Sequence, residues 1–361
     1  MLNFNFMIET PTYNKNIKKY KIEKLTSHQF KNFLELNCQI YPNRKNIEER
    51  FKYQILNNPL LEDKSNTFIL LAYSEENKIV GQLVCNPYEY FLGKTYLKGF
   101  NICDFYVLED YRKKGIGSSL VRTAITNLKP CTLVKVTEVT KKICLSNRLN
   151  IIGYLYNYIW FRNSLCVIKA LIYSLFKRLC MTKILNALDF PGTLNVNNFT
   201  FIKVNSLDKW KCSKWDDNTF VFGRSKEFMK WRFFQNPEAF HFYLLDETEP
   251  NTYFVMKRSH WRELNIVEII DYRVPSNDTK KFELILKAIK LLVKIANLDG
   301  VIITSSHRFF DDLLKKSFFF KGKQSDEIIL SGDINVDEYK NTIKKRNFVV
   351  TTTIDLAWYG F

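Results

Sequence analysis

One short segment has the residue types and spacing of an anion-binding loop. It reads Arg112-Lys113-Lys114-Gly115-Ile116-Gly117-Ser118, after a strand-like run and before a run with helical periodicity. Glycines let the backbone approach a ligand closely, and the free N–H groups at a helix start attract negative charge. Arg112 and Lys113 add charge-assisted contacts to phosphate. These residues predict a site for a pyrophosphate group.

The loop differs from two common nucleotide-binding motifs. It lacks the Gly-Lys-Ser/Thr of a Walker loop, and Leu120 stands where the dinucleotide fingerprint has its third glycine. The segment from Asp104 to Ser118 instead resembles the acetyl-CoA-binding motif of the GNAT N-acetyltransferases, with its Arg/Gln-x-x-Gly-x-Gly/Ala loop. The order of elements extends the resemblance over about residues 20–160.

The resemblance implies a co-substrate and its binding residues. The co-substrate is acetyl-CoA, whose pyrophosphate is held by backbone N–H groups of the loop and whose pantetheine arm pairs with the preceding strand. An amine held by the protein then attacks the thioester carbonyl directly, while a base takes its proton. The binding residues so implied are Phe105, Tyr106, Val107, Arg112, Lys113, Lys114, Gly115, Ile116, Gly117 and Ser118.

The sequence offers three candidates for acid–base catalysis. Glu138 is expected on the strand after the loop helix, either facing the cleft of the family geometry or as a solvated strand end. Asp104 has a counterpart, Asp271, in a later segment of the chain that repeats this pattern but lacks the glycines. The recurrence favours a structural role for Asp104. Tyr154 is a candidate for the acid that protonates the leaving thiolate, with Tyr156 and Tyr158 as alternatives.

The elements around the loop indicate a mixed α/β fold. Residues 67–73 and 78–86 predict a hairpin, and residues 98–107 predict the strand before the loop. The loop helix ends at Pro130, and residues 131–139 predict the next strand. Strand, glycine-containing loop, helix and strand form a β-α-β unit.

The second half of the chain repeats this order. Residues 102–107 recur as residues 269–274, followed by a helix over about 279–297 and a strand at 301–304. Thr279, Phe282 and Leu284 take the places of Arg112 and the two glycines, so no coenzyme is expected there. The resemblance therefore implies two GNAT-like domains, each a mixed, mostly antiparallel sheet flanked by helices, the second degenerate.

This reading divides the chain into a catalytic domain at 1–160, a basic amphipathic connector at 161–198 and a degenerate domain at 199–361. The apolar stripe of the connector is expected to pack between the domains, with contact to an anionic membrane surface as the alternative. The stripe comprises Leu165, Ile168, Leu171, Ile172, Leu175, Phe176 and Leu179. Trp231 and Arg232 are expected to bind an acceptor phosphate or carboxylate, or else to lie in the core.

Composition narrows the class of protein. The net charge is +17, but no nucleic-acid-binding motif accompanies it, so no nucleic-acid partner is expected. The eight cysteines form no C-x-x-C pair and only four histidines occur, so no metal site is predicted. Free thiols such as Cys103 and Cys166 lie in apolar runs, which favours a reducing, cytoplasmic compartment, with the inner face of the membrane as the alternative. The first ten residues lack the pattern of a secretory signal.

These observations predict an N-acetyltransferase that moves an acetyl group from acetyl-CoA to a small amine. The first expectation for the acceptor is an amino sugar of cell-surface polysaccharide assembly, because tandem GNAT-like chains of this size resemble acyltransferases of such pathways. Two alternatives remain open. One is a tRNA-dependent aminoacyltransferase of the peptidoglycan-bridge type, against which the intact coenzyme loop argues. The other is a non-catalytic acyl-CoA-binding protein.

Overall fold

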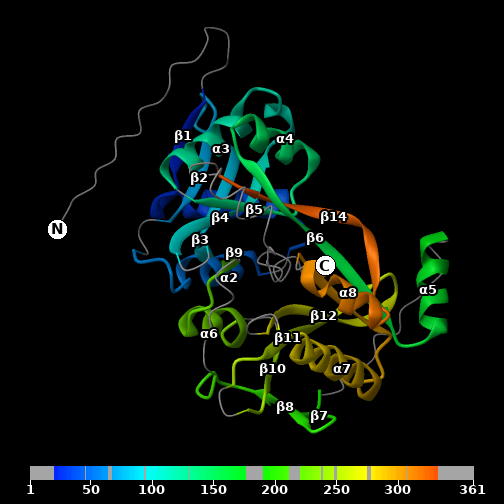
Figure 1. Ribbon diagram of the computed structural model, residues 1–361. Coiled ribbons are helices and arrows are strands. Elements are labelled where there is room, and N and C mark those ends of the chain that lie inside the picture. Colours follow the sequence, from blue (N-terminus) through cyan, green and yellow to red (C-terminus); the bar gives the residue numbers. More distant parts are fainter. Residues whose placement is uncertain are drawn as a thin grey trace.

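The computed structural model describes residues 20–331, apart from 45, 64–66, 93–94, 129, 176–189, 211–219, 237–238, 248–249, 275–277 and 307. The described strands form one 14-stranded sheet that runs through both halves of the molecule (Figure 1). Its order is β1-β2-β3-β4-β5-β14-β6-β13-β12-β11-β10-β8-β7, with β9 paired to β3.

In the first half of the sheet, all neighbouring strands are antiparallel except for one parallel pair. Strands β1 to β4 pair in antiparallel order, and β5 lies parallel to β4. The strands are β1 (Lys21–Lys24), β2 (Ile69–Tyr73), β3 (Ile79–Leu92), β4 (Thr95–Val107), β5 (Cys131–Val134) and β6 (Asn150–Phe161). The helices are α1 (Phe30–Ile40), α2 (Ile47–Phe51), a π-helical turn η2 (Lys52–Leu56), α3 (Ile116–Asn127), α4 (Glu138–Ser146) and α5 (Ser164–Leu175), with 3-10 turns η1 (Ser27–Gln29) and η3 (Glu109–Tyr111).

The second half has the same strand order. Strands β10, β11 and β12 are antiparallel, and β13 lies parallel to β12. The strands are β7 (Thr193–Val196), β8 (Phe199–Val204), β9 (Phe220–Phe222), β10 (His241–Leu245), β11 (Tyr253–Trp261), β12 (Leu264–Arg273), β13 (Gly300–Ser305) and β14 (Phe320–Leu330). The helices are α6 (Lys226–Phe234), α7 (Thr279–Ile295) and α8 (Arg308–Lys316).

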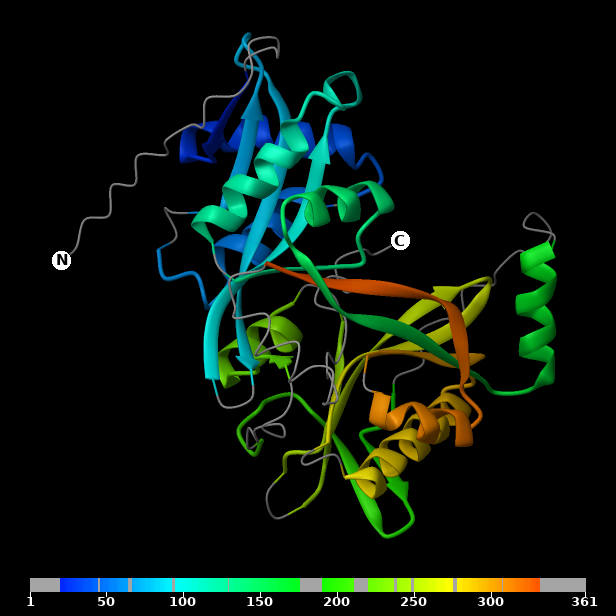
Figure 2. The same ribbon diagram turned by 45° about the horizontal axis from the view of Figure 1, so that its top comes forward.

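The two halves exchange their last strands. Strand β14, from the second half, pairs with β5 of the first half, and β6, from the first half, pairs with β13 of the second. Strands β14 and β6 also pair with each other, so they form the centre of the continuous sheet (Figure 2). A Cβ on Gly300 would lie 2.4 Å from the carbonyl oxygen of Trp160, so only glycine allows β13 to approach β6 this closely.

Alternation along the strands places the core on both faces of the sheet. In β2, Ile69 and Leu71 pack with α1 residues such as Phe33, while Leu70 and Ala72 pack with α3. The second half is built alike, with α7 and α6 packed into two separate clusters of buried residues. Because both faces are covered, central strands such as β2 and β13 are buried along their whole length.

Two predicted elements are corrected. The strand expected over 131–139 ends at Val134, because the Thr137 hydroxyl accepts a hydrogen bond from the Thr140 N–H and caps α4 at that point. The connector helix begins only at Ser164, since the residues up to Phe161 belong to β6. Phe176 and Leu179 of the predicted stripe lie outside the described residues.

The apolar stripe of α5 does not pack between the two halves. Leu165, Ile168, Leu171 and Ile172 are 41–66% exposed, and the helix instead buries the small side chains of Cys166 and Ala170. The expectation of a buried stripe was therefore wrong. Among the described residues, no helix is both long and apolar enough to cross a membrane.

Candidate active site

The first feature of the candidate site is the point where β4 and β5 part. Their parallel pairing in the described residues comprises only Phe100 with Cys131 and Asn101 with Thr132, although β4 continues to Val107. On its other edge, β5 pairs with β14 from Thr132 to Val134. The backbone of β4 from Ile102 to Val107 therefore presents an edge that is not paired with β5, and an extended ligand can pair with such an edge.

A β-bulge lies within this edge of β4. On the β3 side, Val84 pairs with Cys103 and Gln82 with Tyr106, so Asp104 and Phe105 together oppose one residue. Asp104 has φ 42°, in the left-handed region that few residues other than glycine adopt. Bulges re-aim the chain and are frequent next to active sites.

The predicted loop opens helix α3 at the end of this edge. Gly115 is the N-cap residue with φ 81°, and a Cβ there would find only the Tyr20 hydroxyl, at 3.7 Å, within 4 Å. The side chain of Arg112 ties the loop to the strand, because its Nε donates to the Val107 carbonyl (3.1 Å) and its Nη2 to the Tyr106 hydroxyl (3.2 Å). The first amides of α3 lack intrahelical acceptors by geometry and can bind an anion.

The second glycine also has a role in packing. A Cβ on Gly117 would lie 3.1 Å from Cζ of Phe105 and 3.2 Å from Cδ1 of Ile143. Gly117 thus lets α3 pack closely on β4 and α4, so its absence of a side chain serves helix packing. The next residue, Ser118, accepts a hydrogen bond from Nδ2 of Asn147 at 2.9 Å, which links α3 to the end of α4.

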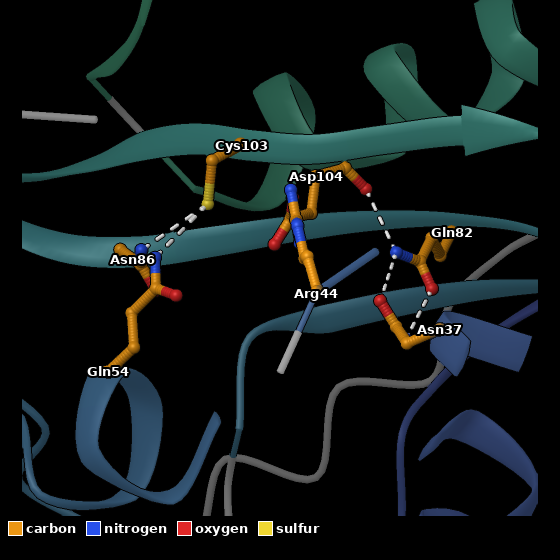
Figure 3. Close-up of polar contacts among 7 residues, drawn as sticks. All are labelled: Asn37, Arg44, Gln54, Gln82, Asn86, Cys103 and Asp104. Atoms are coloured by element: carbon orange, nitrogen blue, oxygen red, sulfur yellow. Dashed lines mark hydrogen bonds and ion pairs between the residues drawn. The ribbon is translucent and has the colours of Figure 1, made fainter. Parts of the chain in front are cut away.

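A polar cluster lies on the other face of β4, toward α1 and η2 (Figure 3). Asp104 forms an ion pair with Arg44 (2.8 Å), and its backbone carbonyl accepts from Nε2 of Gln82 (3.2 Å). The amides of Gln82 and Asn37 donate to each other at 2.9 and 3.1 Å. These contacts stabilise the bulge through both the side chain and the backbone carbonyl of Asp104.

Cys103 is at the centre of the second part of this cluster. Its sulfur accepts from Nδ2 of Asn86 (3.3 Å) and from Nε2 of Gln54 (3.8 Å), and the three side chains converge in Figure 3. Asn86 is 3% exposed, and its Oδ1 is buried without a hydrogen-bond partner. Because an amide has both a donor and an acceptor arm, Asn86 has one arm left to bind a ligand.

Tyr41 completes this face. The Arg44 guanidinium lies 3.5 Å from the centroid of the Tyr41 ring. Burial, followed by the nearby Asp104 carboxylate, raises the pKa of Tyr41 far above its ordinary value. The phenol therefore stays protonated at neutral pH.

The structure brings Asp104 and the loop to one site but not the other two catalytic candidates. Glu138 begins α4 with a side chain 76% exposed, 3.7 Å from Lys141, so its expected place on a strand facing a cleft was wrong. Tyr154 lies on β6 and is 40% exposed, and its backbone pairs with Glu327 of β14.

The expected acceptor-binding pair is buried. Trp231 is 3% exposed and its indole N–H donates to the carbonyl of Tyr53, while Arg232 is 5% exposed and donates to the Tyr88 hydroxyl at 3.1 Å. Both contacts cross from α6 to the first half of the chain. The structure thus corrects the acceptor-binding expectation in favour of its core alternative.

Sequence reasoning missed the amide residues of the site. Cys103 was expected to be a buried apolar thiol, but it is half-buried among amides, whereas Cys166 is buried as expected. A signal was available, because Gln82 and Asn86 interrupt the apolar face of a predicted strand at even spacing. Arg44 and Gln54 gave no comparable signal, since Arg44 lies in the connection after α1 and Gln54 in the short turn η2.

The motif and the fold agree with one family. Residues 30–142 match the model of the acetyltransferase (GNAT) family. This part of the chain is a GNAT-family domain. The predicted resemblance is thereby confirmed, as is the mixed α/β fold with a large, mostly antiparallel sheet. The predicted anion-binding loop lies inside the matched range, as does the polar cluster around Asp104 and Cys103.

Solved structures with a similar fold include known and probable acyltransferases. A GCN5-related N-acetyltransferase from Anabaena variabilis is 14% identical, with a TM-score of 0.56, over 86% of this chain and 72% of that one. A probable N-acyltransferase from Enterococcus faecalis is 10% identical, with a TM-score of 0.56 and the same coverage. The N-myristoyltransferase of Saccharomyces cerevisiae, solved with bound myristoyl-CoA, is 12% identical, with a TM-score of 0.55, over 96% of this chain and 86% of that one. A search by sequence among curated proteins finds no match.

Proposed function

We propose that this GNAT protein transfers an acyl group, acetyl in the first instance, from acyl-CoA to a primary amine of a small acceptor. The observation that carries the proposal is the edge of β4 that is not paired with β5, which leads directly to the Gly115 N-cap of α3. An extended pantetheine arm fits such an edge, and a pyrophosphate fits the helix start beside it. The residues present therefore suit a coenzyme A thioester.

We place the acceptor on the opposite face of β4, beside Cys103. The unused Oδ1 of Asn86 can accept a hydrogen bond from an acceptor N–H or O–H there. The surrounding side chains are mostly uncharged amides, which suit a polar, hydroxyl-bearing amine such as an amino sugar. In the transfer, the amine nitrogen forms a bond to the thioester carbonyl carbon, the C–S bond breaks, the thiolate leaves as coenzyme A and the amine loses its proton.

We propose that Asp104 is a positioning residue in this reaction. Its ion pair with Arg44 and the hydrogen bond to its carbonyl fix the bulge that presents the β4 edge. Among the described residues, neither Glu138 nor Tyr154 forms a side-chain hydrogen bond or ion pair with the bulge, so neither is retained as the base or acid.

We further propose that the second half is a GNAT-like domain that has lost coenzyme binding. Its Asp271 pairs with Arg224 beside a bulge in β12, as Asp104 pairs with Arg44 beside the bulge in β4. The parallel pairing of β12 with β13, however, covers four residue pairs, from Ile266 with Gly300 to Ile269 with Ile303. Less of the β12 edge is therefore available to a ligand. The domain limits we propose follow from this repeat: 1–160, a connector at 161–198, and 199–361.

Calorimetric titration with acetyl-CoA, together with an amine screen read by thiol release, tests the proposed activity. Ser118 is at the start of α3, where proline is tolerated because its missing N–H has no intrahelical acceptor. We expect Ser118→Pro to weaken acetyl-CoA binding at least tenfold. Ser118→Ala, which keeps the N–H and loses the contact with Asn147, serves as the matched control and should bind normally.

The outcomes separate the alternatives. Equal binding by both variants would contradict the assigned loop. Tight binding without thiol release from any amine would favour the non-catalytic reading. Tighter binding of long-chain acyl-CoA than of acetyl-CoA would change the proposed acyl group and leave the site in place.

A further inference from the structure

Helix α5 has its small side chains inside and its large apolar side chains outside. Cys166 and Ala170 pack against Leu264, Ile266 and Ile302 of the sheet. On the outer side, the exposed fractions are 66% for Leu165, 49% for Ile168, 56% for Leu171 and 41% for Ile172. A helix that covers only a sheet normally turns its large apolar residues inward, so this outer face is built to be covered by something else.

The exposed residues form one continuous stripe. Leu165, Ile168 and Ile172 follow one another at spacings of three and four, and Leu171 lies beside them. Both ribbon views show α5 at the periphery of the molecule, after the end of β6 and apart from the other labelled helices (Figures 1 and 2). The stripe is therefore accessible to a large flat surface.

The charge around the stripe is positive. The described residues of α5 contain one charged side chain, Lys169, which is 61% exposed. The Arg262 side chain lies beside the helix, because its Nη1 donates to the Ser174 hydroxyl (2.8 Å) and its guanidinium lies 4.5 Å from the centroid of the Trp261 ring. The acidic residue near Lys169 is Asp299, at 3.9 Å, and its side chain is only 12% exposed.

We propose that the α5 stripe, with Lys169 and Arg262 at its margin, docks on the surface of an anionic lipid membrane. The four apolar side chains would enter the boundary between headgroups and acyl chains, and the basic side chains would meet lipid phosphate. The helix lies along the surface, since a described length of 12 residues spans about 18 Å.

Charge complementarity favours lipid over a second copy of the chain. A symmetric contact through α5 would bring two positively charged margins together, whereas an anionic membrane supplies the opposite charge. This inference goes beyond acyl transfer, because it concerns where the enzyme works, and it does not depend on the identity of the acceptor.

Flotation of the full chain with vesicles tests the inference. We expect the protein to float with phosphatidylcholine vesicles that contain phosphatidylglycerol, and to be released by high salt. Leu171→Asp should reduce the bound fraction at least tenfold. Val139→Asp is the matched control, because Val139 is 69% exposed on α4, and this variant should bind as the wild type does. Both positions are exposed, so thermal unfolding of the variants should match that of the wild type.

The results that overturn the inference are equally specific. It fails if the protein does not float with anionic vesicles, or if Leu171→Asp floats as well as the wild type. It also fails if light scattering shows a dimer that Leu171→Asp dissociates, since a second copy then covers the stripe. Acetyl-CoA affinity, measured on the same variants, should be unchanged, which separates this test from that of the proposed activity.

Discussion

Tyr53 and Trp231 hold each other across the two halves of the chain. The Trp231 indole N–H donates to the Tyr53 carbonyl at 3.1 Å, and the Tyr53 hydroxyl donates to the Trp231 carbonyl. Their rings stack with centroids 5.2 Å apart and an interplanar angle of 16°. The two rings and the two polar groups therefore all take part in the contact, which joins η2 to helix α6. The turn η2 also carries Gln54 of the polar cluster.

Substitution of Trp231 should therefore act on stability. We expect Trp231→Leu to lower the free energy of unfolding by about 3 kcal/mol, because it leaves a cavity and removes a buried hydrogen bond. Urea denaturation measures this loss. Phe199→Leu, at a position 46% exposed, is the control and should change little. A large rise in acceptor KM at unchanged stability would instead restore the acceptor-binding role.

The roles of Asp104 and Asp271 can be distinguished by one matched pair of substitutions. Asp271 is buried and receives both Nε and Nη2 of Arg224, at 2.9 and 2.7 Å, so Asp271→Asn should cost about 3 kcal/mol of stability by leaving a buried charge unpaired. Asp104→Asn should cost less, because Arg44 is 20% exposed. Only Asp104→Asn should also lower kcat, through the bulge. If it abolished the acid limb of the pH–rate profile, Asp104 would be the base.

Glu138→Gln should leave turnover within about twofold of the wild type. An exposed carboxylate at the start of a helix contributes mainly to the helix dipole and to a solvent-screened ion pair, both small terms. Steady-state kinetics with acetyl-CoA and an active amine measure the effect. A loss on the order of 10²-fold would return Glu138 to the catalytic residues.

Stability should decline at alkaline pH through the buried tyrosines. Burial raises the pKa of Tyr243 and of Tyr272 above the ordinary value of 10.0. The folded state therefore keeps these protons at a pH where the unfolded state has lost them. The contribution of the two tyrosines to the free energy of unfolding is constant below about pH 10 and falls above it. Urea denaturation at pH 9 and pH 11 shows the difference. Tyr243→Phe should make the decline shallower, and stability that rises above pH 10 would contradict the assignment.

The glycine-containing loop and the helix that follows it could be predicted from the sequence, and the polar cluster on the other face of β4 could not. Gly115, Gly117 and Arg112 lie within six consecutive residues, and the left-handed turn and helix start they form are local structure. That cluster includes Arg44, Gln54, Asn86 and Cys103, which meet only after η2 and α1 pack on the sheet. Glu138 was misplaced because the Thr137 cap outweighs the strand pattern around it.

The exchange of β14 and β6 has a consequence for the order in which the chain folds. The Cys131 N–H, at the start of β5, donates to the hydroxyl of Ser331, 200 positions further along the chain. Strand β14, which pairs with β5, is thus among the last described parts to leave the ribosome. In a nascent first half, the edge of β5 that pairs with β14 would be unpaired, and unpaired strand edges are sites that chaperones protect. This state ends only when synthesis has passed residue 331. The first half therefore completes its part of the sheet only after β14 has been synthesised, and not as an independent domain.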